Sequence, residues 1–290
     1  MSTSDLSALT SNGCKLARDS RYFGPLLTSD SSVFGSGSAR ARFERDGYLC
    51  VRQALPRAHV LAVRQAYFEL FDPSFLKEGD ARRGEFSGCM PSGLPAHGSR
   101  GHPAHRFVRS PEFGAFRRLP ALAQMAEAVV GGPVVQLQRA PLRHFICGSR
   151  CASRPHLDRT YLDAKGHANV TLWIPLGDCP IEAGGLLYLE GSHTEPEIET
   201  IARASGPTDR LQDRRPLTND LEWLSQVTRR RWLGIDFEAG DVVLHSPDIV
   251  HASTDCQIPL MRLSTDLRFQ RAGTAADPRW RADWSGDDGH

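Results

Sequence analysis

The chain has 290 residues, with 35 Lys and Arg against 34 Asp and Glu and a net charge of +1. This length allows one large domain with a substantial core. The near-zero charge gives no electrostatic basis for binding nucleic acid or an anionic membrane, so we expect a small molecule or another protein as partner. The seven scattered cysteines, without a Cys-x-x-Cys pair, argue against a disulfide framework. No long apolar run or signal-peptide core is present, which predicts a cytoplasmic protein.

Residues 1–37 are rich in Ser, Thr and Gly, and we predict an irregular N-terminal arm in which the apolar residues 22–27 could dock on the domain. Ordered structure should begin near Ala39, with a short helix through 42–44 and a strand at 48–51. Pro56 opens a predicted helix, because the apolar residues that follow recur at helical spacing.

The region from 75 to 110 is rich in Gly, Pro, Arg and His and has no sustained periodicity. Loops of this length inside a domain are usually functional or disordered. We expect the region to form the entrance of a site and its polar residues His97, His102, His105 and Arg106 to be solvent-exposed. After it, Ser110 begins a helix as a typical N-cap, and a second helix is predicted over 120–130, where two glycines follow.

From residue 134 onward, short apolar runs separated by turn residues indicate strands. They are at 134–138, 170–174, 186–189, 242–244 and 260–269. Helices followed by strands predict an α+β fold, with the strands closing into a double-stranded β-helix, a cupin-like jelly roll, and flanking helices that are mostly N-terminal. We predict one domain at 38–275. The polar stretch 194–231, with a short helix at 221–224, is expected to be a lid insertion, and 276–290 a C-terminal tail.

A candidate metal site combines two distant segments. His156 and Asp158 are two residues apart, so in an extended chain their side chains share one face. His251, just after an apolar run, would supply a third ligand and leave positions open on the ion, as in non-haem Fe(II) oxygenases. One His-x-Asp/Glu pattern is expected by chance among eleven histidines, and His193 with Glu195 forms a second.

The strands and motifs resemble the phytanoyl-CoA dioxygenase family of Fe(II)- and 2-oxoglutarate-dependent oxygenases, and most of all its bacterial members that hydroxylate natural products. The resemblance covers residues 43–269. It is carried by Phe43-x-x-Asp46-Gly47-Tyr48, His156-x-Asp158, the run 171–176, Gly184-Gly185-Leu186-x-Tyr188-Leu189-x-Gly191-Ser192-His193, Gly240-Asp241-Val242-Val243, His251-x-Ser253 and Arg262. In that family the histidine matching His193 is not an iron ligand, which leaves His193 and Glu195 structural.

The resemblance implies Fe(II), 2-oxoglutarate and dioxygen as cofactor and cosubstrates, a small-molecule substrate, and hydroxylation or another oxidation of a C–H bond. It favours Arg262, eleven residues beyond His251, over Arg268 as the partner of the distal carboxylate of 2-oxoglutarate. For Arg268 the alternative is a salt bridge with a nearby acid. Secondary candidates for cosubstrate contacts are Ser253, Trp173, Thr171 and Gln138, although core packing and strand pairing explain Trp173 and Gln138 equally well.

The substrate stays open at this stage. A dense group of basic residues around the site could attract an anionic substrate or merely coat the surface: Arg139, Arg143, His144, Arg150, Arg154 and Arg159. Two other functions are compatible with the ligand set, namely a redox-neutral cupin-type isomerase or hydrolase with another divalent ion, and a non-catalytic binding protein. The oligomeric state is not indicated.

Overall fold

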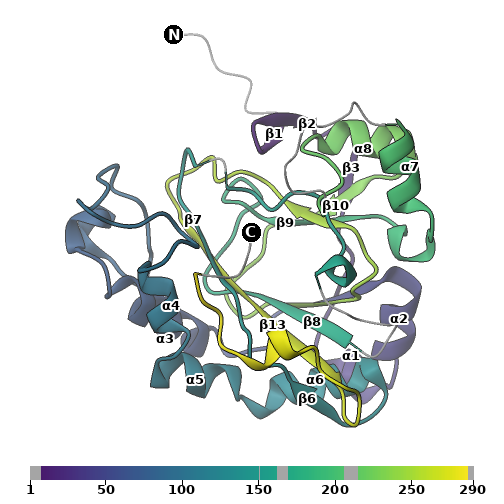
Figure 1. Cartoon of the computed structure of the whole chain (residues 1–290), viewed down its shortest axis with the longest axis horizontal. Helices are drawn as coiled ribbons and strands as arrows, with labels where there is room; N and C mark the ends of the chain where they lie inside the picture. Colours follow the sequence, from purple (N-terminus) through teal and green to yellow (C-terminus); the bar gives the residue numbers. More distant parts are fainter. Residues whose placement is uncertain (1–7, 150, 162–168, 206–214, 287–290) are drawn as a thin grey trace.

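Two β-sheets face each other in this computed structural model, which describes residues 8–149, 151–161, 169–205 and 215–286 (Figure 1). The larger sheet has the order β4-β5-β11-β8-β13-β6, with β7 also pairing with β13. Its strands are β4 (Thr28–Ser29), β5 (Tyr48–Val51), β6 (Val134–Gln136), β7 (Leu142–Phe145), β8 (Asn169–Pro175), β11 (Val242–His245) and β13 (Arg262–Arg271). The smaller sheet, in the order β12-β9-β10-β3, contains β3 (Phe23–Pro25), β9 (Leu186–Leu189), β10 (Trp232–Gly234) and β12 (His251–Ser253).

Helices cover the outer face of the larger sheet, as predicted for the N-terminal half. They are α2 (Ala39–Asp46), α3 (Arg57–Phe68), α5 (Pro111–Arg117) and α6 (Pro120–Val130). Side chains alternate along β8, so Val170, Leu172 and Ile174 pack in the same apolar cluster as these helices. Thr171 and Trp173 therefore face the space between the sheets. None of the described helices has the length and apolar character needed to cross a membrane.

Another layer covers the outer face of the smaller sheet (Figure 1). It consists of α7 (Ile198–Ser205), α8 (Leu221–Thr228) and the hairpin of β1 (Ala8–Ser11) and β2 (Cys14–Ala17). Leu187 and Leu189 of β9 pack there with Ile198 and Leu221. The described part of the expected lid is thus an outer layer of the fold, and residues 206–214 lie outside the described residues.

The described part of the expected irregular arm is not irregular. The β3 strand pairs in parallel with β10, and β4 pairs in parallel with β5, so the segment adds a strand to each sheet. A short helix, α1 (Ser32–Gly35), follows. Strands of two to four residues are too short to show an alternating pattern, and their pairing with sheet edges determines their conformation. Residues 1–7 lie outside the described part of the chain.

The tail is also part of the domain. Trp280, in the 3-10 helix η6 (Pro278–Arg281), and Trp284 are buried. The carbonyl of Trp280 accepts hydrogen bonds from the backbone N–H groups of Gln138 and Arg139. Through these contacts residues 278–284 form a wall next to β6 and β7.

The histidines of the 75–110 region correct another prediction. The region contains η1 (Pro73–Phe75), η2 (Lys77–Gly79) and α4 (Pro103–Phe107), and it is otherwise irregular. His102 and His105 are buried, not solvent-exposed. The ring of His102 lies 4.9 Å from that of His97 and 6.4 Å from that of His144. Contacts between aromatic rings from separate segments bury these side chains, and sequence periodicity does not reveal such contacts.

The buried His144 makes the stability of the folded protein depend on pH. Burial lowers the pKa of His144 well below its ordinary value of 6.5. At pH values between the pKa of His144 in the folded protein and its value of 6.5 in the unfolded chain, the unfolded chain binds a proton that the folded protein does not. The contribution of the neutral His144 to the free energy of unfolding is therefore complete above pH 6.5 and is lost as the pH falls below it. The loss at pH 5 is about 2 kcal/mol for one such group.

We expect the His144→Phe variant to lose about 2 kcal/mol less stability than the wild type between pH 7 and pH 5, as measured by urea unfolding. At pH 7 the variant should be about 1 kcal/mol less stable, because the Tyr67 hydroxyl, 3.0 Å from His144 Nδ1, loses its partner. The matched variant His59→Phe, at an exposed histidine, should keep the full acid loss. An equal acid loss in both variants would contradict this explanation.

Candidate metal centre

The backbone brings His156 and His251 opposite each other. They form an antiparallel bridge, in which the His156 N–H donates to the His251 carbonyl at 3.1 Å and the reverse bond is 3.0 Å long. Leu157 is extended, with φ −110° and ψ 134°, so Asp158 returns to the same side as His156. Asp158 then begins the 3-10 helix η3 (Asp158–Thr160). The predicted metal-binding residues therefore come together from two distant segments.

Each imidazole has a backbone partner on one ring nitrogen. His156 Nδ1 lies 2.6 Å from the Arg154 carbonyl and His251 Nδ1 lies 3.1 Å from the Ile249 carbonyl, so both Nδ1–H groups are donors. The Nε2 atoms are left with lone pairs, and each lies 3.9 Å from Asp158 Oδ1. All three ligand atoms lie within 4.8 Å of one another. Two imidazoles and one carboxylate are the donor set typical of a non-haem iron centre with open positions.

The charges of the three side chains suit a divalent cation. Burial lowers the pKa of both His156 and His251, so their imidazoles are neutral at neutral pH. For Asp158, burial would raise the pKa, but the Arg268 charge and a hydrogen bond from His245 outweigh it and hold the pKa well below the usual range. Neutral imidazoles and an ionised carboxylate are the protonation states that bind a metal.

Three side chains orient the Asp158 carboxylate. Thr171 donates a hydrogen bond of 2.6 Å to Oδ2, and Arg268 Nη2 donates one of 3.0 Å to Oδ1. His245 Nε2 lies 3.4 Å from Oδ2, and its Nδ1 lies 2.9 Å from the Tyr188 hydroxyl. Thr171 thus contacts a candidate metal ligand, and Arg268 forms the salt bridge considered as its alternative role. His245 was not predicted as a site residue, because the predicted strand 242–244 ended one residue too early. Extending its alternation to His245 places this residue on the inner face with Val243.

We expect Thr171→Val to weaken Fe(II) binding by about 10-fold, because partners that orient a metal ligand typically contribute 10- to 100-fold to metal affinity. The matched variant Thr265→Val also removes a buried hydroxyl, which in the wild type donates to the Pro141 carbonyl and not to Asp158. Anaerobic calorimetry with Fe(II) would compare the two. Equal affinities in both variants would show that the hydrogen bond to Asp158 does not support metal binding.

Arg262 is buried with an incomplete set of partners. Its Nη1 donates to the Gly184 carbonyl at 2.7 Å and its Nε to Ser264 at 3.1 Å. The guanidinium lies 4.3 Å from the Phe145 ring centroid and 5.4 Å from that of Trp173. Arg262 Nη2 and Trp173 Nε1 are both buried donors without an acceptor. Unsatisfied buried donors are rare, and a carboxylate is an acceptor that would satisfy them.

Ser253 has a defined partner of its own. It lies on β12 with His251, is fully buried, and its Oγ accepts a 2.8 Å hydrogen bond from the Ser153 backbone N–H. This bond ties the segment that carries His156 to the strand that carries His251. Ser253 therefore supports the site geometrically, whether or not it also contacts the cosubstrate.

The structure does not bring two other sequence candidates into the site. Gln138 lies beyond the end of β6, is exposed, and donates a hydrogen bond to Asp283, so the predicted cosubstrate contact is not supported. The strand was predicted to continue to residue 138, but it ends at Gln136. His193, from the rival motif, lies with its Nε2 3.2 Å from the Glu44 carbonyl and is structural, as inferred from the sequence.

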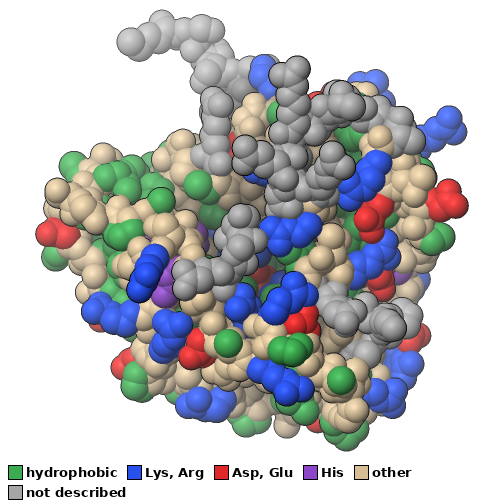
Figure 2. Space-filling model, viewed as in Figure 1, with side chains coloured by type: hydrophobic (Ala, Val, Ile, Leu, Met, Phe, Trp, Pro, Cys, Tyr) green, Lys and Arg blue, Asp and Glu red, His purple; other side chains and the backbone are tan. Residues whose placement is uncertain are grey.

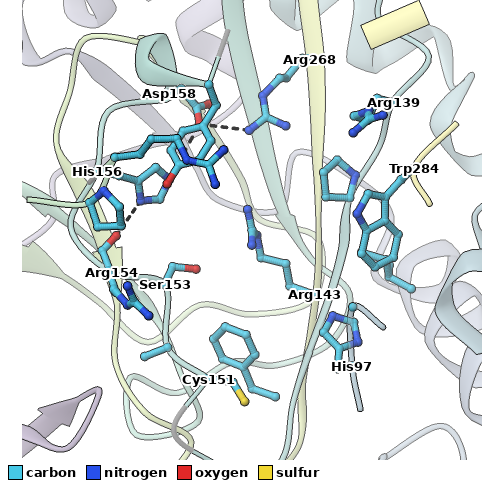
Figure 3. Close-up of a pocket in the computed structure, with 18 of the residues that line it drawn as sticks. His97, Arg139, Arg143, Cys151, Ser153, Arg154, His156, Asp158, Arg268 and Trp284 are labelled. Carbon is cyan, nitrogen blue, oxygen red and sulfur yellow. Dashed lines mark hydrogen bonds and ion pairs between the residues drawn. The ribbon is translucent and has the colours of Figure 1, made fainter. Parts of the chain in front are cut away.

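A cavity of about 420 Å³ opens on the metal centre (Figure 3). His156 and Asp158 form part of its wall, together with aromatic side chains that the sequence reasoning missed: Phe145, Tyr161, Trp280 and Trp284. His97 also lines it, which agrees with the prediction that the 75–110 region contributes to the entrance. Phe145 lies on β7, a strand that the sequence analysis did not predict, and the other three lie in segments without periodicity, where the sequence does not indicate where a side chain points.

The described members of the predicted basic group lie in different places: the cavity wall, the buried aromatic cluster and the surface. Arg139, Arg143 and Arg154 line the cavity. His144 lies in the aromatic cluster, and Arg159 forms 3.0 Å ion pairs with Asp248 and Glu199. Arg150 lies outside the described residues. Three of the six residues therefore line the cavity.

A family model decides the assignment. Residues 43–257 match the model described as phytanoyl-CoA dioxygenase (PhyH). The chain belongs to the phytanoyl-CoA dioxygenase family. The resemblance found in the sequence is confirmed, and with it the double-stranded β-helix core of the family. No curated protein shows significant similarity to the chain.

Solved structures share the fold of this family member at low identity. The epimerase SnoN, solved in complex with Fe3+, alpha ketoglutarate and nogalamycin RO, is 19% identical with a TM-score of 0.58, covering 85% of this chain and 87% of its own. The alpha ketoglutarate dependent carbocyclase SnoK from nogalamycin biosynthesis is 20% identical with a TM-score of 0.57, covering 88% and 90%. AviO1 from Streptomyces viridochromogenes Tue57 is 23% identical with a TM-score of 0.55, covering 83% and 97%.

Membership of the phytanoyl-CoA dioxygenase family makes the protein an enzyme of the 2-oxoglutarate-dependent, non-haem iron type. The His156, Asp158 and His251 cluster fits the iron, and the unsatisfied donors of Arg262 and Trp173 fit a carboxylate. Iron, 2-oxoglutarate and dioxygen are therefore the cofactor and cosubstrates, as predicted from the sequence.

Proposed function

We propose that the protein oxidises an unactivated C–H bond of a small molecule in the cytoplasm, with hydroxylation of a natural-product intermediate as the outcome. The observation that carries this proposal is that the Nε2 atoms of His156 and His251 both lie 3.9 Å from the Asp158 carboxylate, and that Asp158 and His156 line a cavity. Such a donor set leaves coordination positions for a keto acid and dioxygen. The cavity volume is in the range of small-molecule sites.

The residues have distinct roles in this proposal. His156, Asp158 and His251 hold the iron. Arg262 binds the distal carboxylate of 2-oxoglutarate, supported by its unsatisfied Nη2 and by the neighbouring Trp173 Nε1. When bound, iron and 2-oxoglutarate activate dioxygen for attack on a C–H bond.

The other side chains hold the metal ligands in position and shield the site from water. Thr171 and Arg268 fix the Asp158 carboxylate, so the ligand does not reorient as the substrate enters. Ser253 holds the two ligand-bearing segments together through its bond with Ser153. The walls of the cavity orient the C–H bond toward the metal centre and exclude water.

The test is turnover under labelled dioxygen. The anaerobic protein is loaded with Fe(II) and 2-oxoglutarate, candidate small molecules are added, and ¹⁸O₂ is admitted. Hydroxylation predicts one labelled oxygen atom in the product and one equivalent of succinate. Succinate with an unlabelled, rearranged product would indicate another oxidative outcome, and product without succinate would establish the redox-neutral isomerase or hydrolase alternative.

A further inference from the structure

The cavity wall is strongly basic. Among the described residues that line it, Asp158 is the only one with a carboxylate, whereas six are arginines: Arg139, Arg143, Arg154, Arg215, Arg268 and Arg279. We call these the cavity arginines. In Figure 3, Arg143 and Arg268 extend toward the middle of the cavity, and Arg154 lies on the side opposite Arg139. Several Lys and Arg side chains also gather near the middle of the face shown in Figure 2. Guanidinium groups keep their charge at any physiological pH.

Acidic neighbours offset only part of this charge. Arg268 pairs with Asp158, and Arg143 pairs with Asp266, each at 3.0 Å. Arg279 pairs with Asp277. Arg154, which is partly exposed to the cavity, has neither a hydrogen bond nor an ion pair from its side chain within the described ranges. Like charges gathered around one cavity repel each other, and a bound anion relieves that repulsion.

Arg268 supplies unsatisfied donors as well as charge. It is 4% exposed, and its Nε and Nη1 atoms are buried without an acceptor. Its guanidinium lies 4.5 Å from the ring centroid of Trp280, whose contact holds the guanidinium in place. A second stack, of Arg215 on Tyr161 at 4.6 Å, holds another of the cavity arginines. Planar guanidinium groups held in this way match the geometry of carboxylate and phosphate oxygens.

The cosubstrate does not account for the cavity arginines. Its proposed partner, Arg262, is not one of them and lies behind the Phe145 ring. The charge of Fe(II) and that of the 2-oxoglutarate dianion would cancel each other. Binding of both therefore leaves the charge of Arg154 without a partner among the described residues, and the remaining space is where the substrate must enter.

We propose that the substrate is an anion, and that the cavity arginines, with Arg154 among them, bind its carboxylate or phosphate group while the substrate body packs against Trp280 and Trp284. This inference rests on the proposed function and defines its substrate class. The anionic group acts as an anchor that fixes which C–H bond faces the metal centre.

The test measures binding of simple probes to the anaerobic protein saturated with Fe(II) and 2-oxoglutarate, by calorimetry in low-chloride buffer. The probes are phenyl phosphate, benzoate and the neutral benzyl alcohol. The variants are Arg154→Gln and Arg154→Glu, with Arg82→Gln and Arg82→Glu as matched controls at an exposed arginine outside the cavity. Thermal unfolding checks that all variants are folded. We expect the Arg154 variants to fold, because the Arg154 side chain has no hydrogen bond or ion pair within the described ranges that a substitution would remove.

We expect both anions to bind the wild type at least about tenfold more tightly than benzyl alcohol. Arg154→Gln should weaken anion binding about tenfold, as expected for the loss of one charge-assisted hydrogen bond, and Arg154→Glu should weaken it further. Benzyl alcohol binding and both Arg82 variants should not change. Tighter binding of phenyl phosphate would identify a phosphorylated substrate, and equal or tighter binding of benzoate a carboxylate.

Equal binding of the anions and benzyl alcohol would overturn the inference, as would anion binding that Arg154→Glu leaves intact. The binding of 2-oxoglutarate is measured first, in the same titration series. Protein that binds 2-oxoglutarate but shows no preference for anions contradicts only this inference. Protein that fails to bind 2-oxoglutarate contradicts the proposed function, and its probe affinities still test the cavity arginines.

Discussion

Replacing Asp158 with alanine should weaken Fe(II) binding by more than about 100-fold and abolish succinate formation from 2-oxoglutarate. Partners that only orient a ligand contribute 10- to 100-fold to metal affinity, so the loss of a ligand should have a larger effect. The variant should also lose about 3 kcal/mol of stability, because Arg268 would stay buried without its ion-pair partner. Anaerobic calorimetry measures Fe(II) binding, and a succinate assay measures turnover of 2-oxoglutarate.

Asp266→Ala is the matched control for this variant. Asp266 is a buried carboxylate on the same strand face as Arg268, and it pairs with Arg143 at 3.0 Å, but it does not belong to the metal cluster. We expect a similar loss of stability with Fe(II) affinity kept within about threefold. If Asp158→Ala bound Fe(II) as tightly as Asp266→Ala, the assignment of Asp158 as a ligand would be wrong.

Replacing Arg262 with glutamine should weaken 2-oxoglutarate binding about 100-fold without changing Fe(II) affinity. Two charge-assisted hydrogen bonds to a carboxylate contribute about 3 kcal/mol, which corresponds to that factor. Calorimetry with the anaerobic Fe(II) protein measures the dissociation constant directly. The same substitution at Arg268, which contacts Asp158, should act mainly on Fe(II) affinity.

A second measurement separates a lost contact from general damage to the fold. 2-Oxopentanoate lacks the distal carboxylate, so the wild type should prefer 2-oxoglutarate over it by about 100-fold, and Arg262→Gln should show little preference. A variant that is merely disordered would bind both keto acids poorly. Loss of the preference in Arg268→Gln but not in Arg262→Gln would assign the carboxylate to Arg268 instead.

Local rules predict part of the candidate metal centre. Alternation along an extended chain places His156 and Asp158 on one face, and the same rule places Thr171 and Trp173 on the inner face of β8. The meeting of these residues with His251 depends on a bridge between segments about a hundred residues apart, and the family resemblance supplied that link. The predicted helices are long enough for their periodicity to be visible in the sequence, and the predicted strands are visible as short apolar runs between turn residues.

What could not be predicted depends on contacts between aperiodic segments. Trp280 and Trp284 lie in a stretch that reads as a tail, and only their packing next to β6 and β7 makes them part of the cavity. His102 was expected in solvent because histidine is polar, yet edge-on ring contacts with His97 and His144 bury it. For Arg268 the sequence left two roles open, and the structure shows the salt bridge, with Asp158 as the acid. The sequence gives the strand face of a side chain but not its partner.

Oxygen-dependent succinate formation is the most direct test of the central claim that His156, Asp158 and His251 hold one iron with room for 2-oxoglutarate. Protein loaded anaerobically with Fe(II) and 2-oxoglutarate is exposed to dioxygen, and succinate is quantified against bound iron. We expect the wild type to form succinate and Asp158→Ala to form none. It would be contradicted by iron-loaded wild type that forms no succinate, or by an Asp158→Ala variant that forms as much.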